Sequence, residues 1–143
     1  MPSVRIEHLT VTYIDKKKNE TEAIHDLSCT FRPDSFNVVM GFSGCGKTTL
    51  LKAIGGFFAF DGYIYIDGTD ADTLPTRKRN LAYVSQEYVL YPSLTVFDNI
   101  AFPLRTAHKK RDEVTAAVTK IAETFGLTDC LTRLPRYLSG GQQ

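Results

Sequence analysis

Residues 40–56 read MGFSGCGKTTLLKAIGG and place several glycines directly before a strongly helical pattern. Apolar side chains then recur at helical spacing, at Leu50, Leu51, Ile54 and Phe57. The closing pair of glycines predicts the end of that helix. The short apolar run FNVVM, at 36–40, is typical of a strand buried on both faces. This stretch therefore predicts a strand, a glycine loop and a helix in succession, which belongs to an α/β fold.

The glycine loop matches the pattern G-x-x-x-x-G-K-[ST] from Gly41 to Thr48. Phosphate oxygens need several converging backbone N–H groups, and glycine lets the chain fold that closely. The following helix directs its unpaired N–H groups and the positive end of its dipole at the anion. Lys47 would neutralise the β- and γ-phosphates, and the Thr48 hydroxyl would bind Mg²⁺. The predicted nucleotide site comprises Gly41, Phe42, Ser43, Gly44, Cys45, Gly46, Lys47, Thr48 and Thr49.

The rest of the chain changes from strand-like to helix-like patterns. Nearly alternating apolar residues predict strands at 4–14, 23–31, 61–68 and 81–85. From residue 109 a helical stripe replaces the alternation, and Gly126 closes it. We therefore expect a mixed α/β lobe at 1–85 and a helical lobe at 86–143.

The bulk composition narrows the class of protein. The 143 residues carry a net charge of +1, which gives no electrostatic case for nucleic acid as a partner. No run of about 18 apolar residues would span a membrane. The three cysteines are odd in number and far apart, which disfavours a disulfide framework or a zinc site. Cys45 is either a small residue at a free position of the loop or a thiol that bound ATP shields from alkylation.

The chain ends in LSGGQQ, at 138–143. On its own this second glycine motif could be a simple turn, but in a chain that also has a phosphate loop it is specific for one protein family. The whole chain resembles the nucleotide-binding subunit of an ABC transporter. The stretch LYPSLTVFDNIAFPLR, at 90–105, looks most like carbohydrate-type importers, although polyamine and anion importers share it. The resemblance implies part of an ABC-type P-loop NTPase core, an α/β fold with an antiparallel β subdomain and a helical subdomain.

The resemblance also assigns roles outside the phosphate loop. Tyr13 falls where the family stacks an aromatic ring on adenine, although a tyrosine in such a strand can simply pack. Gln86 falls at the Q-loop, which contacts Mg²⁺ and the attacking water, although a glutamine there can also be a plain capping group. Lys47 and Gln86 would then be catalytic, and Thr48 and Gln86 would be the metal ligands. The signature itself is Ser139, Gly140, Gly141 and Gln142, of which the first and third would contact the γ-phosphate of ATP on an opposite subunit.

Such a shared site implies a head-to-tail dimer with a second ATP-binding subunit. The other partners implied are membrane-spanning permease subunits and an extracytoplasmic substrate-binding protein, without nucleic acid. ATP and Mg²⁺ are the implied cofactors, and the cytoplasmic face of the cell membrane is the implied location. Binding and hydrolysis of ATP would drive import of a solute.

Part of the family's hydrolytic machinery is expected downstream of LSGGQ. The Walker B aspartate, the glutamate after it and the switch histidine all follow the signature in the family, so we expect this chain to be an N-terminal portion without turnover of its own. Asp67 ends an apolar strand, but Gly68 rather than a second acid follows, so we expect no Mg²⁺ role for it. The alternatives are a soluble ABC protein of translation or DNA maintenance, and a nucleotide-binding fragment that does not hydrolyse ATP.

Overall fold

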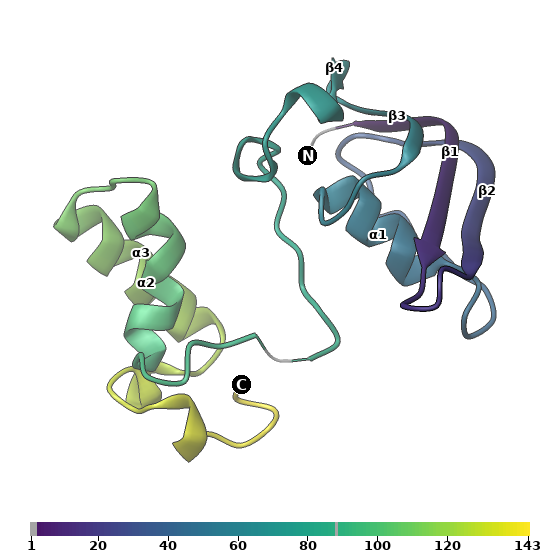
Figure 1. Cartoon of the computed structure of the whole chain (residues 1–143). Helices are drawn as coiled ribbons and strands as arrows, with labels where there is room; N and C mark the ends of the chain where they lie inside the picture. Colours follow the sequence, from purple (N-terminus) through teal and green to yellow (C-terminus); the bar gives the residue numbers. More distant parts are fainter. Residues whose placement is uncertain (1–2, 88) are drawn as a thin grey trace. The chain divides into compact units, whose positions relative to one another are not determined.

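The computed structural model describes residues 3–87 and 89–143, which form two compact units. The chain passes from the first unit to the second between Tyr83 and Val84. Figure 1 shows the first unit, from purple to teal, as a sheet with a helix, and the second, from green to yellow, as mainly helical. Each unit has a hydrophobic core of its own. The structure thus contains a unit of sheet and helix followed by a helical unit, as the sequence patterns predicted.

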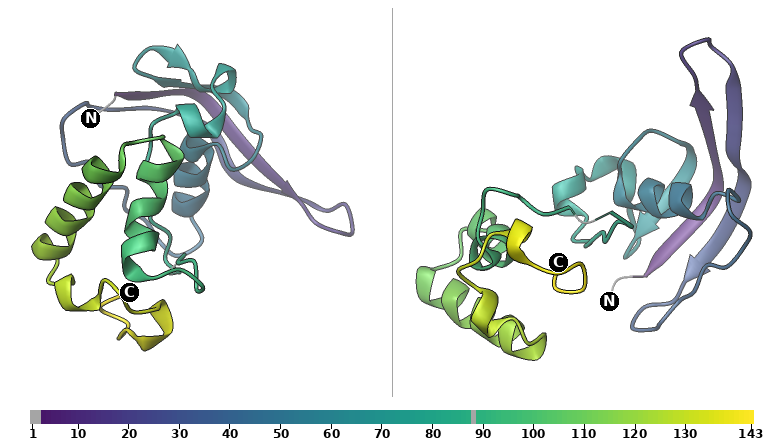
Figure 2. Two further views of the ribbon diagram at one scale, coloured as in Figure 1. Left: turned by 90° about the vertical axis from the view of Figure 1, so that its left-hand side faces the viewer. Right: turned by 90° about the horizontal axis from the view of Figure 1, so that it is seen from below.

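In the described part of the chain, a four-stranded antiparallel sheet runs in the order β2-β1-β3-β4. Its strands are β1 (Val4–Ile14), β2 (Glu20–Phe31), β3 (Asp61–Ile66) and β4 (Thr69–Asp70). The alternating patterns in the first three therefore predicted real strands. Figure 2 shows the β1–β2 hairpin extending beyond the rest of its unit. A turn between Asp15 and Asn19 closes it.

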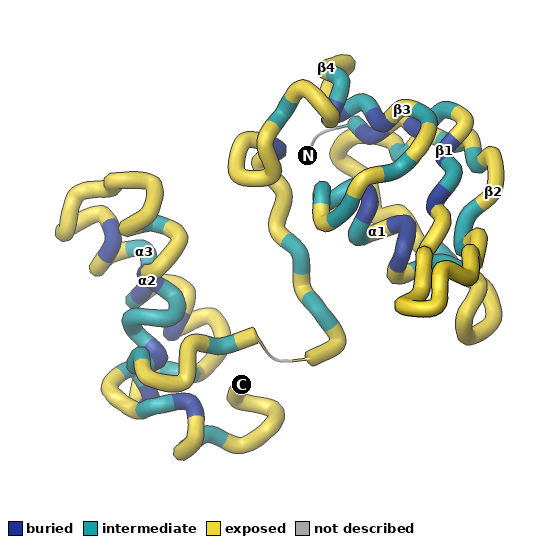
Figure 3. Tube along the Cα trace, in the orientation of Figure 1, coloured by how far each residue is buried: buried dark blue, intermediate teal, exposed yellow. Residues whose placement is uncertain are grey.

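Helix α1 (Lys47–Gly55) packs against this sheet. Leu50 and Ala53 of α1 are buried in one cluster with Ile6, Leu9 and Ile64 of the sheet. Figure 3 shows buried stretches of α1 and of the sheet in dark blue. The helix ends at a C-cap glycine, Gly56, whose φ of 75° is left-handed. The predicted helix and its glycine stop are both confirmed, and the core fixes α1 beside the sheet.

The strands predicted at 36–40 and 81–85 are wrong, because both segments are irregular in the structure. A strand forms only where a neighbouring strand accepts and donates its backbone hydrogen bonds. Within the described residues, the sheet contains only β1 to β4 and pairs with neither segment. Most of their apolar side chains stay exposed, with 94% of Phe36 and 92% of Val84 open to solvent, although Val39 packs partly against the core of the sheet. Of the predicted strand, loop and helix around residue 41, the structure contains the loop and the helix.

The second unit is built on α2 (Val96–Thr106) and α3 (Arg111–Thr124). Ala101, Val114 and Val118 form its buried core, which confirms the helical stripe predicted from residue 109 onward. Short 3₁₀ turns complete the two units, at η1 (Ala71–Thr73), η2 (Thr76–Lys78), η3 (Thr128–Cys130) and η4 (Pro135–Tyr137). Across residues 3–87 and 89–143, none of the helices is long and apolar enough to cross a bilayer.

Candidate functional site

The phosphate loop, residues 41–48, is a tight turn that leads into α1. Gly44 and Gly46 have φ values of 81° and 89°, a region that side chains rarely adopt. A Cβ on Gly46 would lie 2.6 Å from the Ala23 carbonyl oxygen of β2. A Cβ on Gly41 would lie 2.5 Å from the Cys45 sulfur. Gly46 is therefore required by its backbone angle and by close approach of the loop to β2, and Gly44 by its backbone angle, whereas at Gly41 the nearest atom belongs to a side chain that can move.

The N-terminus of α1 is free of side-chain caps. Its N-cap is Gly46, which provides no side-chain acceptor, and its first turn contains no acidic residue. The first N–H groups of a helix have no intrahelical partner, and they carry the positive end of the helix dipole. This end of α1 therefore suits an anion such as a phosphate group.

Lys47 folds its ammonium group back over the loop. Its Nζ donates to the carbonyl oxygens of Gly41, at 2.8 Å, and Phe42, at 2.6 Å, and lies 3.5 Å from the Cys45 sulfur. An ammonium group is attracted to the negative charge of a phosphate oxygen in addition to any hydrogen bond, and a neutral carbonyl oxygen offers no such charge. A phosphate group at the loop could thus replace the two carbonyls as the partner of Lys47.

Three further loop residues are exposed beside the glycines: Phe42, Ser43 and Thr48. Thr48 follows Lys47 in the first turn of α1. Its hydroxyl is the kind of oxygen ligand that Mg²⁺ prefers, and its exposure leaves it accessible to a cation carried by a nucleotide. Thr49, the next residue, is buried instead.

Tyr13, near the end of β1, lies next to the same helix. Its hydroxyl donates to Thr49 Oγ1 at 3.2 Å. The residue is 43% exposed, so part of its ring is open to a ligand. The structure thus places the predicted stacking residue within hydrogen-bond reach of the phosphate-loop helix.

The signature motif in the second unit forms a reciprocal hydrogen-bonded pair. Ser139 Oγ accepts from the Gln142 backbone N–H at 3.3 Å, and Gln142 Oε1 accepts from the Ser139 N–H at 3.0 Å. This S-x-x-Q arrangement is a capping box, which marks the start of a helical turn. Gly140 and Gly141 lie exposed between the two. Sequence reasoning missed this structural role of Gln142, although the spacing in LSGGQ contains its signal.

Gln86 is exposed in an irregular segment of the second unit. The phosphate loop belongs to the first unit, and Ser139 to the second. The structure thus groups Tyr13 with the phosphate loop, and it groups the signature residues with one another. The roles of Gln86 and of the signature toward ATP remain predictions from the resemblance.

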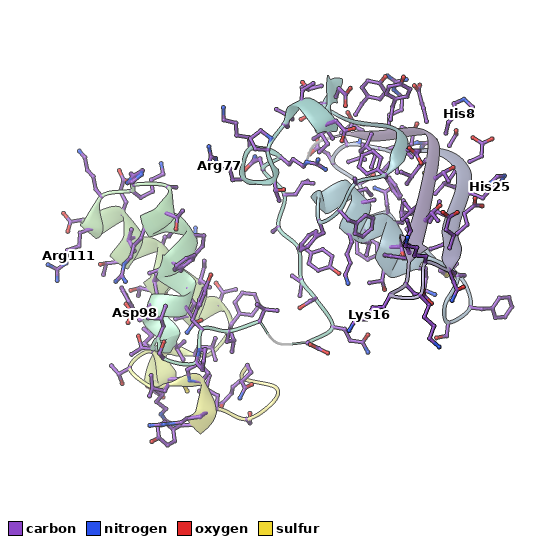
Figure 4. All side chains as sticks on the ribbon, viewed as in Figure 1. His8, Lys16, His25, Arg77, Asp98 and Arg111 are labelled. Carbon is purple, nitrogen blue, oxygen red and sulfur yellow. The ribbon has the colours of Figure 1, made fainter. Side chains whose placement is uncertain are left out.

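Acidic and histidine side chains outside the loop pair locally. Figure 4 shows His8 and His25 extending outward from β1 and β2. His8 Nδ1 lies 2.6 Å from a carboxylate oxygen of Asp26, and His25 Nδ1 lies 2.7 Å from Glu22. Asp67 accepts from the Ser3 backbone N–H at 2.8 Å. Among the described residues, no group of three or more such side chains could hold a metal ion.

Several known proteins are similar to this chain in sequence. The sequence model of the ABC transporter family matches residues 24–143. The alpha-glucoside transport ATP-binding protein AglK of Rhizobium meliloti is 40% identical over 131 residues, which cover 91% of this chain and 36% of that protein. The molybdate/tungstate import ATP-binding protein WtpC of Pyrococcus abyssi is 38% identical over 141 residues, which cover 98% of this chain and 39% of that protein. The chain therefore spans well under half the length of these curated relatives.

A solved structure is similar along nearly the whole chain. The ATP-binding cassette MJ0796, in a dimeric post-hydrolysis state bound to ADP and Pi, superposes with a TM-score of 0.86 at 27% identity. The match covers 97% of this chain and 64% of that one. The similarity extends over the strand-and-helix unit and the helical unit alike.

Proposed function

This chain belongs to the ABC transporter family, and we propose from that membership that it forms the N-terminal portion of the ATP-binding subunit of an importer. The observation that carries the proposal is the phosphate loop: glycines in left-handed geometry, an uncapped helix N-terminus and the Lys47 ammonium converge there. These are the donors and the charge that a triphosphate requires.

Each residue of the proposed site has a distinct task. The loop amides and Lys47 bind the β- and γ-phosphates, and Tyr13 stacks on the base. Thr48 and Gln86 would hold Mg²⁺, which would supply positive charge that offsets the charge developing on the phosphates. Gln86 also orients the attacking water. Lys47 and Gln86 are thus the proposed catalytic residues of this chain.

The proposed assembly is a head-to-tail dimer. Each nucleotide lies between the phosphate loop of one subunit and the signature of the other, so Ser139 and Gly141 contact the γ-phosphate on the partner. The dimeric state of the similar cassette MJ0796 supports this arrangement. Closure on ATP and reopening after hydrolysis would move the helical lobes, residues 86–143, and the permease subunits attached to them.

The chemical class of the transported solute is a second, more specific proposal. The similarity to an alpha-glucoside transport protein supports a sugar-type substrate delivered by an extracytoplasmic binding protein. A molybdate/tungstate import protein is similar to almost the same degree, so the proposal of import has broader support than the choice of sugar.

Titration with a fluorescent ATP analogue tests the proposal. We expect saturable binding that Mg²⁺ strengthens and that Lys47→Ala weakens about tenfold or more, the effect of losing charge-assisted hydrogen bonds to phosphate. Lys16→Ala, at the exposed tip of the β1–β2 hairpin, is the matched control and leaves the affinity unchanged (Figure 4). Equal affinity in the wild type and in Lys47→Ala would contradict the proposed site.

A further inference from the structure

The ring of Tyr13 is held by two contacts of different kinds. At its far end, the hydroxyl donates to Thr49 Oγ1 at 3.2 Å. At its side lies the ring of Phe58. The centroids of the two rings are 5.7 Å apart, and the angle between the ring planes is 69°. The nearly perpendicular geometry is a favourable one for aromatic pairs. Two contacts at different points of one ring limit rotation about both of its side-chain bonds.

Both partners of Tyr13 are themselves fixed. Thr49 is buried in α1, two residues after Lys47. Phe58, just beyond the end of α1, packs against the core cluster of the sheet. The ring of Tyr13 is therefore set in position relative to the helix that begins at the phosphate loop, although Tyr13 itself belongs to β1.

We infer that Phe58 and the Thr49 hydroxyl are positioning groups for the nucleotide base, acting through Tyr13. The inference rests on the proposed function and deepens it. They hold the ring in the orientation that receives a base whose triphosphate lies at the N-terminus of α1. A ring ordered in advance loses less conformational freedom on binding, which favours a ligand that carries both a base and phosphates.

The experiment compares ATP with inorganic tripolyphosphate, which has the phosphates and no base. Both are titrated against the full chain in competition with the fluorescent ATP analogue. Tyr13→Phe removes the hydrogen bond and keeps the ring. Phe58→Leu removes the neighbouring ring and keeps an apolar side chain. We expect each variant to weaken ATP about two- to tenfold, the effect of one side chain that must now be ordered on binding, and to leave tripolyphosphate unchanged.

Further variants separate positioning from a general structural role. Phe58→Tyr keeps the aromatic edge and is expected to retain the affinity for ATP. Because both contacts order the same ring, the double variant is expected to lose less affinity than the product of the two single losses. Tyr63→Phe removes a hydroxyl from an exposed tyrosine of β3 and serves as the control without effect.

Two outcomes overturn the inference. One is unchanged ATP affinity in both Tyr13→Phe and Phe58→Leu. The other is an equal loss for ATP and tripolyphosphate, which would mean that the contacts only support the fold of α1. Failure of the proposed function would give a different result. In that case Lys47→Ala would weaken the binding of neither ATP nor tripolyphosphate.

Discussion

Cys45 offers a direct chemical test at the scale of single residues, because its thiol is exposed within the phosphate loop and lies 3.5 Å from Lys47 Nζ. If ATP occupies the loop, it covers this thiol. We expect a maleimide to label Cys45 several times more slowly with MgATP than without it, measured by mass spectrometry of the labelled peptides.

The other two cysteines are internal controls for that experiment. Cys130 is buried and Cys29 is partly buried. Burial also raises the pKa of the Cys29 thiol, and the thiolate is the reactive form, so Cys29 reacts slowly at neutral pH with or without nucleotide. If Cys45 is labelled at the same rate in both conditions, ATP does not cover the loop.

At the scale of the elements, a buried arginine holds the end of α1. Arg79 donates from Nη1 to the carbonyl oxygens of Ala53, at 3.3 Å, and Ile54, at 3.0 Å, and from Nε to Leu74, at 3.4 Å. A cation at a helix C-terminus also interacts favourably with the helix dipole. Arg79 therefore connects the end of α1 to the segment between η1 and η2.

We expect Arg79→Met to lower the free energy of unfolding of the first unit by about 2–3 kcal/mol, because charged hydrogen bonds are lost and buried carbonyls stay unpaired. Urea unfolding followed by circular dichroism measures this loss. Arg77→Met changes an exposed arginine of η2 and is the matched control, with an expected effect within about 0.5 kcal/mol. A similar loss in both variants would rule out a specific role for Arg79.

Asp98 makes the start of α2 dependent on pH. The hydrogen bond from the Thr95 hydroxyl to its carboxylate, at 2.6 Å, holds the pKa of Asp98 below the usual 3.8, and Arg105 at 2.8 Å adds to this against the effect of partial burial. A pKa lowered by folding stabilises the folded state above the unfolded value and loses that effect as pH falls through the folded one.

We therefore expect Asp98→Asn to destabilise the helical unit at pH 7 by at most about 1 kcal/mol, since the pair with Arg105 is partly exposed. The difference between variant and wild type should shrink below pH 3.8 and vanish once the carboxyl is protonated. Thermal melts across this pH range measure it, with the exposed Asp129→Asn as control. A difference that does not shrink as the pH falls below 3.8 would exclude the carboxylate as its cause.

Local patterns in the sequence predicted the elements whose partners are also local. The alternation in β1 and β2 and the glycine stop of α1 are examples, since a hairpin or a helix satisfies its backbone within a short stretch. The alternation in β3 also predicted a strand, although its partner β1 is distant in the sequence, with Val4 opposite Ile66. The segments 36–40 and 81–85 have strand-like patterns too, but a pattern cannot supply the neighbouring strand that they need.

Contacts between distant side chains were beyond such patterns. The hydrogen bonds from Arg79 to the end of α1 and the hydrogen bond from Tyr13 to Thr49 join residues 25 or more positions apart. No local pattern in the sequence can therefore predict them. For the site, G-x-x-x-x-G-K-[ST] is a local pattern, and it fixed the phosphate loop. The capping box of Ser139 and Gln142 was equally local and was overlooked beside the signature role of the same residues.

At the scale of the whole molecule, the first unit exposes an unusual amount of apolar surface. Phe36, Val38 and Met40 of the irregular segment 36–40 are exposed, and Leu81 of the other irregular segment is 37% exposed. A groove of 910 Å³, lined by parts of both segments and by α1, adds to this surface. Exposed apolar patches and unpaired backbone both favour association between copies of a chain.

We expect this chain to self-associate at micromolar concentration, which sedimentation velocity measures as a rise in mean sedimentation coefficient with concentration. Replacing Phe36 and Met40 by aspartate should shift the distribution toward monomer, because like charges at the patch oppose contact and cost the monomer little at solvent-exposed positions. Phe125→Asp changes an exposed apolar residue of the second unit and should leave association unchanged. A monodisperse wild-type monomer with one cooperative unfolding transition would show that the exposed segments need no partner.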